Sequence, residues 1–235
     1  MGKSLKLSKE AIERRIQKLL EERAKFIAMI SEMHVELMKG NRKTGKRCWT
    51  VSLAPIIDCV NCSGCGGGEC YDLRNDLIYP QVISSRAKNS AIHKLDPERY
   101  WREIDEQIKV NSVEELRINV GGDLSNNDFA YVAELGRNNP DTMILFFTKN
   151  YNGINAFLDE NEFPQNVRPI MSAWEGMEMD NRHNLPCSHV LYEDGRTTAP
   201  EYGAVYCGGN CTECALKGEG CWTLGKGEHV IFLAH

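Results

Sequence analysis

The sequence Leu116-Arg-Ile-Asn-Val-Gly-Gly-Asp123 decides how the chain folds. Residues 116–120 are expected to form a strand, because β-branched and other apolar residues alternate there with polar ones. A glycine pair and an aspartate follow where that strand ends. A helix is expected from Asn127 to Gly136 and a further strand from Met143 to Phe147. A strand, a helix and a strand in this order indicate a βα unit with parallel strands.

The same alternation extends to both sides of this unit. Asp96 is a suitable N-cap and Pro97 a suitable first residue for one of the helices. We expect an α/β fold with about six to seven mostly parallel strands, either open or curled into a TIM-barrel-like partial (β/α) barrel. The further strands are expected at residues 49–53, 167–172, 189–192, 204–206 and 230–233, and the further helices at residues 80–95, 97–110 and 151–159.

A long helix is expected at the start of the chain, from Ser8 to Lys39. Ser8 can cap it, Glu10 lies in its first turn, and Gly40 can end it. Apolar residues recur at helical spacing, so one face should pack on the domain or on a second copy in a homo-oligomer. We therefore expect an N-terminal helical extension (residues 1–40), a partial barrel (41–200) and a cysteine-rich segment that closes with a strand (201–235).

Composition limits the class of protein. The 235 residues suit one domain with a full hydrophobic core, or one domain plus an appendage, and the net charge of −5 does not favour a general nucleic-acid binder. No apolar run has the length of a membrane span, and the first residues lack the apolar core of a signal peptide. We expect a cytoplasmic protein without a membrane segment.

Eight of the ten cysteines fall into two clusters of four. Their spacings let thiolates converge on zinc or on a 4Fe–4S cluster, and in a reducing compartment such cysteines are more often ligands than disulfides. Spacing alone does not separate the two metals. The remaining two cysteines, Cys48 and Cys187, stand alone and are expected to be buried small side chains. The predicted metal ligands are Cys59, Cys62, Cys65 and Cys70 in the first cluster and Cys207, Cys211, Cys214 and Cys221 in the second.

Polar residues follow successive predicted strands. In parallel sheets and barrels the carboxyl ends of the strands form the ligand-binding rim, so these residues should face one mouth. Gly121 and Gly122 would let a ligand approach the backbone, and Asp123 would accept a bond from an amine; a tight turn into the next helix is the alternative. The first cysteine loop follows the first strand, and candidate substrate-facing groups after later strands are Lys149, Ser172 and Glu193.

This order resembles that of the radical SAM enzymes. In those enzymes a cysteine loop after the first strand holds a 4Fe–4S cluster, and a Gly-Gly-Glu-like segment after the second holds the amino group of S-adenosyl-L-methionine. Here Asp123 stands in place of the Glu, and the loop has four cysteines at other spacings than the usual Cys-x3-Cys-x2-Cys. The resemblance implies a radical-SAM-like fold, an electron donor and radical chemistry on a substrate.

A closer resemblance is to the phage gene-product-eighty-eight family, over roughly residues 41–235. It implies a phage or mobile-element origin and says little about substrate. The similar segments are Asn41-Arg-Lys-Thr-Gly-Lys-Arg-Cys-Trp-Thr-Val-Ser-Leu-Ala-Pro55, Cys70-Tyr71, Ile118-Asn-Val-Gly-Gly-Asp123, Phe147-Thr-Lys149, Val205-Tyr-Cys207, Cys211-x2-Cys214, Cys221-Trp222 and Ile231-Phe-Leu-Ala-His235.

Two hypotheses follow. The first is a radical-SAM-like enzyme whose first cysteine loop binds 4Fe–4S, while the second cluster holds an auxiliary 4Fe–4S cluster or a structural zinc that ties down the C-terminal segment. The second is a non-catalytic protein with two zinc sites that binds a protein or nucleic-acid partner, with the long helix suited to such contacts.

Overall fold

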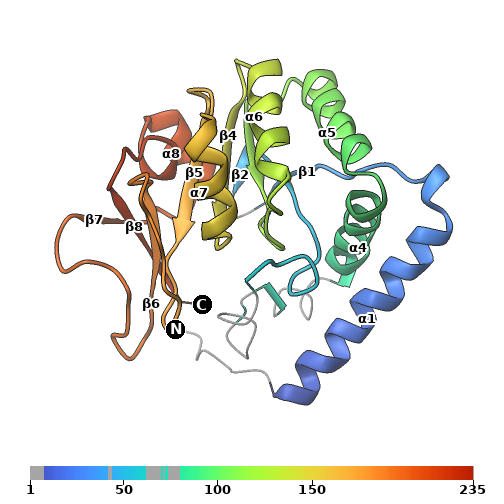
Figure 1. Ribbon diagram of the computed structural model, residues 1–235, viewed down its shortest axis with the longest axis horizontal. Coiled ribbons are helices and arrows are strands. Elements are labelled where there is room, and N and C mark those ends of the chain that lie inside the picture. Colours follow the sequence, from blue (N-terminus) through green and yellow to red (C-terminus); the bar gives the residue numbers. More distant parts are fainter. Residues whose placement is uncertain (1–7, 42–43, 62–69, 71, 74–79, 235) are drawn as a thin grey trace.

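The strand that contains residues 116–118 lies inside one mixed sheet. In the computed structural model, residues 8–41, 44–61, 70, 72–73 and 80–234 are described. Within them the sheet has eight strands in the order β1-β2-β3-β4-β5-β6-β8-β7 (Figure 1). The strands are β1 (Met38–Asn41), β2 (Gly45–Val51), β3 (Glu115–Ile118), β4 (Met143–Thr148), β5 (Val167–Ser172), β6 (Cys187–Leu191), β7 (Ala204–Tyr206) and β8 (His229–Leu233).

Helices connect the strands from β2 to β5. Asp96 caps α5 through Arg99 N, and Pro97 is its first residue, as the sequence predicts. The described residues form six α-helices and two 3₁₀ turns: α1 (Lys9–Ala28), η1 (Ile30–Glu32), α4 (Pro80–Leu95), α5 (Pro97–Asn111), α6 (Asp128–Asn138), α7 (Tyr151–Glu160), α8 (Cys211–Lys217) and η2 (Gly220–Trp222).

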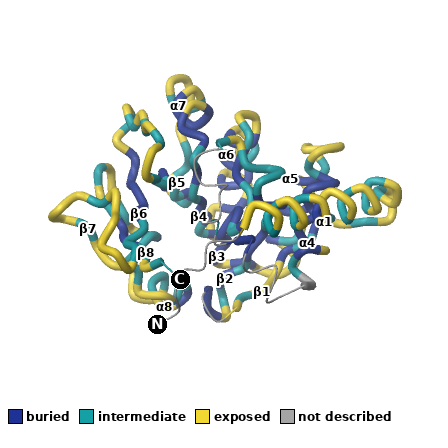
Figure 2. Tube along the Cα trace, turned by 90° about the horizontal axis from the view of Figure 1, so that it is seen from below, coloured by how far each residue is buried: buried dark blue, intermediate teal, exposed yellow. Residues whose placement is uncertain are grey.

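The prediction of a mostly parallel sheet is confirmed. All neighbouring strands from β2 to β7 pair in parallel, and only β1 pairs antiparallel, with β2. From β2 to β6 each new strand is added on the same side of the one before it. Because such crossovers are right-handed, their helices cover one face of the sheet. Burial is accordingly concentrated where α4, α5, α6 and α7 meet β3 and β4 (Figure 2).

Alternation of side chains along the strands gives the sheet two different faces. On β4, Ile144 and Phe146 belong to the large core under the helices, whereas Leu145 belongs to a smaller core on the other face. That smaller core holds Trp222 and packs against the cysteines of the C-terminal segment. Trp222 is anchored at both ends: its Nε1 donates to Cys211 O at 2.9 Å, and its carbonyl accepts from Arg168 Nε at 2.8 Å.

The prediction of a helix to Lys39 is wrong beyond Ala28. After η1 the chain runs extended into β1, because side chains of other helices replace the helical acceptors. Val35 N donates to Glu103 Oε2 at 2.7 Å, and Glu36 N donates to Asn89 Oδ1 at 2.8 Å. Helix α1 itself packs on α4 of the same chain and buries Leu19 completely, while its association with a second copy stays a prediction.

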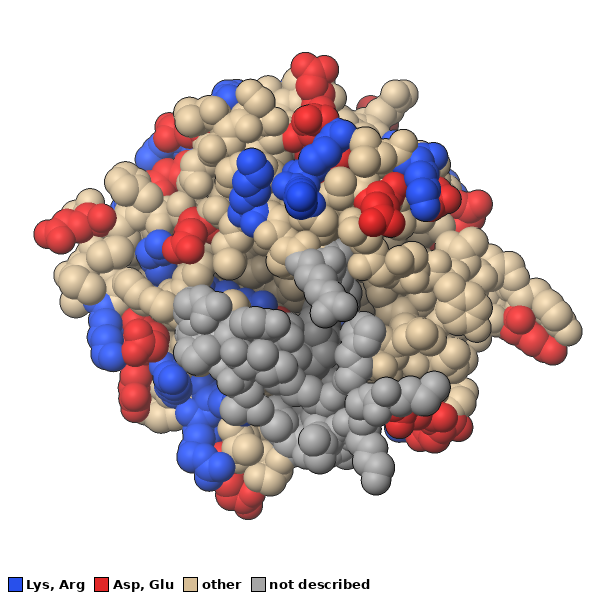
Figure 3. Space-filling view, turned by 180° about the vertical axis from the view of Figure 1, so that it is seen from behind, with Lys and Arg blue, Asp and Glu red and all other residues tan. Residues whose placement is uncertain are grey.

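None of the helices in the described part of the chain has both the length and the apolar character that crossing a bilayer requires. On the face shown in Figure 3, acidic and basic side chains are interspersed. The described surface of this face therefore offers no continuous basic stripe, which agrees with the net charge of −5 of the chain.

Two histidines join neighbouring strands near the end of the sheet. His189 Nε2 lies 2.9 Å from His229 Nδ1, and its other ring nitrogen lies 2.9 Å from Thr198 Oγ1. His189 is buried, and burial together with the nearby His229 lowers its pKa to about 4. The folded state therefore keeps this imidazole neutral at pH values where an unfolded chain would protonate it.

Acidification should destabilise the fold through His189. An unfolded histidine binds a proton below about pH 6.5, but folded His189 does so only near pH 4. Between these two values protonation favours the unfolded chain, so the free energy of unfolding decreases as the pH falls from about 6.5 to about 4. We expect a loss of about 3 kcal/mol. Urea unfolding across this range should show a smaller pH dependence in His189→Gln than in the wild type. Equal slopes in His189→Gln and the wild type would contradict the assignment.

Candidate functional site

The first cysteine loop and the Gly121–Asp123 turn meet at the carboxyl edge of the sheet. Leu53 N, just after β2, donates to Gly121 O at 3.0 Å, and Asp123 N donates to Asp58 O at 3.1 Å. Cys59 is the next residue, so the loop begins beside the turn that follows β3. The residues that flank the loop therefore lie beside this turn, and a shared ligand site of the four cysteines and the turn stays a prediction.

Close packing explains why the turn contains two glycines. A Cβ on Gly121 would lie 2.1 Å from Asp72 Oδ2, and one on Gly122 would lie 2.7 Å from the Leu53 Cβ. Gly122 also has a φ of +78°, which favours glycine. Asp72 forms a buried ion pair with Arg86 at 2.6 Å. The turn is thus held between the two flanks of the cysteine loop, and its contact with a ligand stays a prediction.

The carboxylate of Asp123 is buried, with 7% of the residue exposed. Oδ1 accepts from Thr148 Oγ1 and Leu124 N at 2.7 Å each, and Oδ2 accepts from Lys149 N at 2.8 Å. Burial raises the pKa of this carboxyl, against the lowering effect of these bonds. Asp123 therefore joins the end of β3 to the end of β4, and three of its roughly four acceptor positions are used within the chain.

The other predicted rim residues differ in position. Lys149 lies at the edge with its Nζ 4.9 Å from the centre of the Trp174 ring, and its carbonyl accepts a bond from Asn61 of the cysteine loop. Ser172 contacts Ser188 on β6, with 3.2 Å between the two hydroxyl oxygens. Glu193 is exposed, and among the described residues no interaction joins it to the others.

Asn119 is a residue at this edge that the sequence did not single out. Only 5% of it is exposed, its φ is +53°, and its N–H donates to Val51 O at 2.8 Å. Both polar atoms of its side chain are buried without a hydrogen-bond partner in the described part of the chain. A buried amide without hydrogen bonds destabilises the folded state, so its presence needs an explanation, such as a functional role. Its position at a strand end, two residues before a glycine pair, was the available signal.

The two predicted metal sites differ in what can be described. Cys59 and Cys70 are half-buried, whereas Cys62 and Cys65 lie outside the described residues. Two of the four ligands predicted for the first cluster therefore lie outside the described residues.

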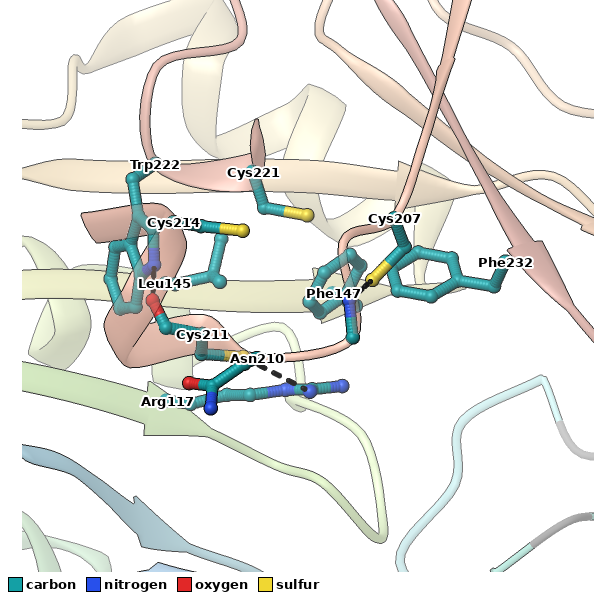
Figure 4. Close-up of a pocket in the computed structure, with 11 residues that line it drawn as sticks. Arg117, Leu145, Phe147, Cys207, Asn210, Cys211, Cys214, Cys221, Trp222 and Phe232 are labelled. Carbon is teal, nitrogen blue, oxygen red and sulfur yellow. Dashed lines mark hydrogen bonds between the residues drawn. The ribbon is translucent and has the colours of Figure 1, made fainter. Parts of the chain in front are cut away.

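All four cysteines of the second cluster line one pocket (Figure 4). Cys207 follows β7, and Cys211 and Cys214 lie one turn apart on α8, so they share a helix face. Cys221 belongs to η2. In Figure 4 the sulfur atoms of Cys207, Cys214 and Cys221 are turned towards the space between these residues. The folded chain thus brings together four thiols, although six residues separate the last two of them, Cys214 and Cys221, in the sequence.

The surroundings of these thiols enclose the sulfurs and, without a cation, favour the protonated form. Gly209 N donates to Cys207 Sγ at 3.4 Å, and a Cβ on Gly220 would lie 3.2 Å from Cys214 Sγ, so the backbone closely encloses the sulfurs. Burial, followed by the neighbouring thiols, raises the pKa of Cys221 to about 12. A bound cation would reverse that effect, because it stabilises the thiolate form.

The donor set fits zinc or an iron–sulfur cluster, since both take four thiolates. The cavity measures about 20 Å³, which is close to the space that one or two water molecules need. Among the described residues, however, no three His, Cys, Asp or Glu side chains have the geometry of a metal site. Metal binding by this cluster stays a prediction.

Strand β2 adds a fifth cysteine to this region. Cys48 is fully buried and packs in the same core as Cys211 and Trp222. A hydrogen bond with Cys211, together with burial, raises the pKa of the Cys48 thiol. The expectation that Cys48 is buried is confirmed, but it does not stand alone. Its contact with a residue more than 160 positions away carries no local sequence signal.

The fold and this region define a cysteine-rich α/β protein with a single, mostly parallel sheet. The chain belongs to the family described as Gene product 88, whose model matches residues 35–215. The match runs from just before β1 into α8 and confirms the resemblance to a phage protein family. No curated protein and no solved structure matches the chain significantly. The more distant resemblance to radical SAM enzymes is not shown by these comparisons.

Replacing Asp123 tests its role at the edge of the sheet. Asp123→Asn places an amide N–H2 group where backbone and hydroxyl donors now converge, so at least one buried hydrogen bond to a charged acceptor is lost. We expect the free energy of unfolding to fall by roughly 2–3 kcal/mol. Urea unfolding of Asp123→Asn and of the exposed control Asp141→Asn provides the comparison. If both variants unfold like the wild type, the carboxylate does not join the two strands.

Proposed function

We propose that the chain is an iron–sulfur enzyme of the radical SAM type. The observation that carries this proposal is the contact between the first cysteine loop and the Gly121–Asp123 turn. The loop follows the first parallel strand, β2, and the turn follows the second, β3. Asp123 N bonds to Asp58 O on one flank of the loop, and Gly121 packs against Asp72 on the other. A cofactor held by the loop would therefore lie beside the turn.

The sheet order supports a partial barrel. Strands β2 to β6 follow one another in space as in sequence, without the reversal that marks a doubly wound sheet. A sheet built by adding strands on one side, with its helices on one face, can curl around the other face. In this proposal the uncovered inner face at the carboxyl end forms the active-site mouth, while the C-terminal cysteine segment covers part of the same face.

The first loop would hold a 4Fe–4S cluster through cysteines among Cys59, Cys62, Cys65 and Cys70. When bound, that cluster would supply the electron that cleaves the sulfonium of S-adenosylmethionine. The chain's own residues would position the ligand. Asn119 offers a donor and an acceptor at the mouth, and Lys149 offers a cation beside Trp174. Asp123 would act by fixing the turn, because its carboxylate already accepts three bonds. Ser172 and Glu193 remain proposed substrate-facing groups.

The second cluster would hold a metal that fastens the C-terminal segment to the sheet. A cavity of about 20 Å³ favours a single zinc ion over an auxiliary 4Fe–4S cluster, because one ion bonds four sulfurs at about 2.3 Å from a common centre. This assignment also suits the alternative function, a zinc-stabilised phage protein that binds a partner. The three hydrogen bonds that Asp123 already accepts within the chain favour that alternative, because they leave little capacity for the amine of a ligand.

Anaerobic purification and reconstitution with iron and sulfide test the proposal. We expect a brown protein with about four iron atoms at the first loop and one zinc at the second cluster. After addition of a strong one-electron reductant and S-adenosylmethionine, it should release 5′-deoxyadenosine and methionine. A matched chain with Cys59→Ser and Cys70→Ser should keep its zinc and lose both iron and cleavage. A colourless wild-type chain with about two zinc ions would contradict the proposal and favour the zinc-stabilised binder.

Removing the Asn119 amide should weaken the cofactor site without unfolding the chain. Asn119→Gly is the suitable change, because glycine adopts the φ of +53° at this position without strain. We expect S-adenosylmethionine to bind the iron-loaded variant about tenfold more weakly, which corresponds to one lost hydrogen bond of roughly 1.4 kcal/mol. Isothermal calorimetry measures the affinity, and Asn138→Gly, at an exposed helix end, is the control. Unchanged affinity in Asn119→Gly would remove this residue from the site.

A further inference from the structure

We infer that Arg117 is the charge-compensating residue of the second cysteine site, an inference that rests on the proposed metal there. Arg117 lies on β3 with 9% of the residue exposed. Its guanidinium donates to Cys211 Sγ at 4.0 Å and lines the same pocket as the four cysteines. In Figure 4 the side chain of Arg117 is extended along one side of that pocket, and its guanidinium lies on the side of Phe147.

Charge makes such a residue necessary. Four thiolates around one divalent ion leave a net charge of −2, as they also do around an oxidised 4Fe–4S cluster. The walls of this pocket are largely apolar, since Leu145, Phe147 and Trp222 contribute to them. Burying a net charge in such surroundings is unfavourable unless an opposite charge lies close by. An arginine keeps its positive charge under all conditions relevant to a protein.

Two further contacts fix the guanidinium at the sulfurs. It lies over the ring of Phe147, with 4.9 Å between its central carbon and the ring centre, an arrangement that stabilises a cation. The acidic residue two positions earlier on the same strand, Glu115, forms an ion pair with Arg47 at 3.2 Å. Arg47 is shared there between Glu115 and Glu114, while the guanidinium of Arg117 is directed to Cys211.

The consequence is a positioning role. Contacts of this kind around a metal site orient the ligands and commonly change metal affinity by ten- to a hundredfold. By attracting the Cys211 thiolate, Arg117 would favour the metal-bound state over the protonated, metal-free one. Charge, more than shape, should carry the effect, so lysine should replace arginine better than a neutral side chain of similar length.

Cobalt(II) binding to the full chain tests the inference. In a background with Cys62→Ser and Cys65→Ser, the first loop cannot supply four thiolates, so the visible spectrum reports the second cluster. Competition with a chelator should show about tenfold weaker binding for Arg117→Gln and most of the affinity retained for Arg117→Lys. The thermal midpoint of the metal-free chain should change equally little in both variants. Arg137→Gln, at an exposed helix end, is the control.

The outcomes separate the two claims. A background chain that binds no cobalt would overturn the proposed metal at the second cluster. A background chain that binds cobalt, with Arg117→Gln binding as tightly, would overturn the role of Arg117 alone. Equal weakening in Arg117→Gln and Arg117→Lys, or weakening matched by an equal loss of metal-free stability, would also overturn it, because the residue would then act through packing.

Discussion

The buried carboxylate of Asp123 is the constraint on which the carboxyl edge of this sheet depends. It holds Thr148 and Lys149 at the end of β4, while its own N–H bonds to Asp58 beside the first cysteine loop. Three segments that are distant in sequence therefore meet at one residue. The glycines before it allow that meeting, since a side chain at Gly121 would collide with Asp72. These contacts hold Asp58, just before the first cysteine of the loop, beside the ends of β3 and β4.

The two faces of the sheet perform different tasks. One face buries the large aromatic and aliphatic side chains of α4 to α7 and supplies the main core. The other face carries Arg117 and Cys48, and Trp222 anchors the C-terminal cysteine segment against it. A short segment with few apolar residues of its own gains a fixed position in this way, and a metal would strengthen that attachment. The proposed active site would then lie at the carboxyl end of the strands, and the proposed zinc site would lie on the face that carries Arg117 and Phe147.

Sequence reasoning predicted the parts of the structure that local pattern determines. The strand at Val167–Ser172 and the capped helix after Asp96 follow from period and capping chemistry, and each was found at the expected residues. The end of α1 was not predictable in this way, because Glu103 and Asn89 of other helices supply the acceptors that end it. The contact of Cys48 with Cys211 and that of Arg117 with the second cysteine cluster were missed for the same reason. Their roles depend on contacts across the sheet, which single-chain periodicity does not report.

The central claim is that the first cysteine loop and the turn after β3 form one cofactor site. Electron paramagnetic resonance of the reduced, iron-loaded chain tests it most directly, in a background with Cys214→Ser and Cys221→Ser that leaves only the first site able to hold a cluster. The account predicts a 4Fe–4S signal whose shape changes when S-adenosylmethionine is added, because the ligand would bind at the iron beside the turn. A signal that S-adenosylmethionine leaves unchanged, or a chain without a cluster signal, would contradict the account.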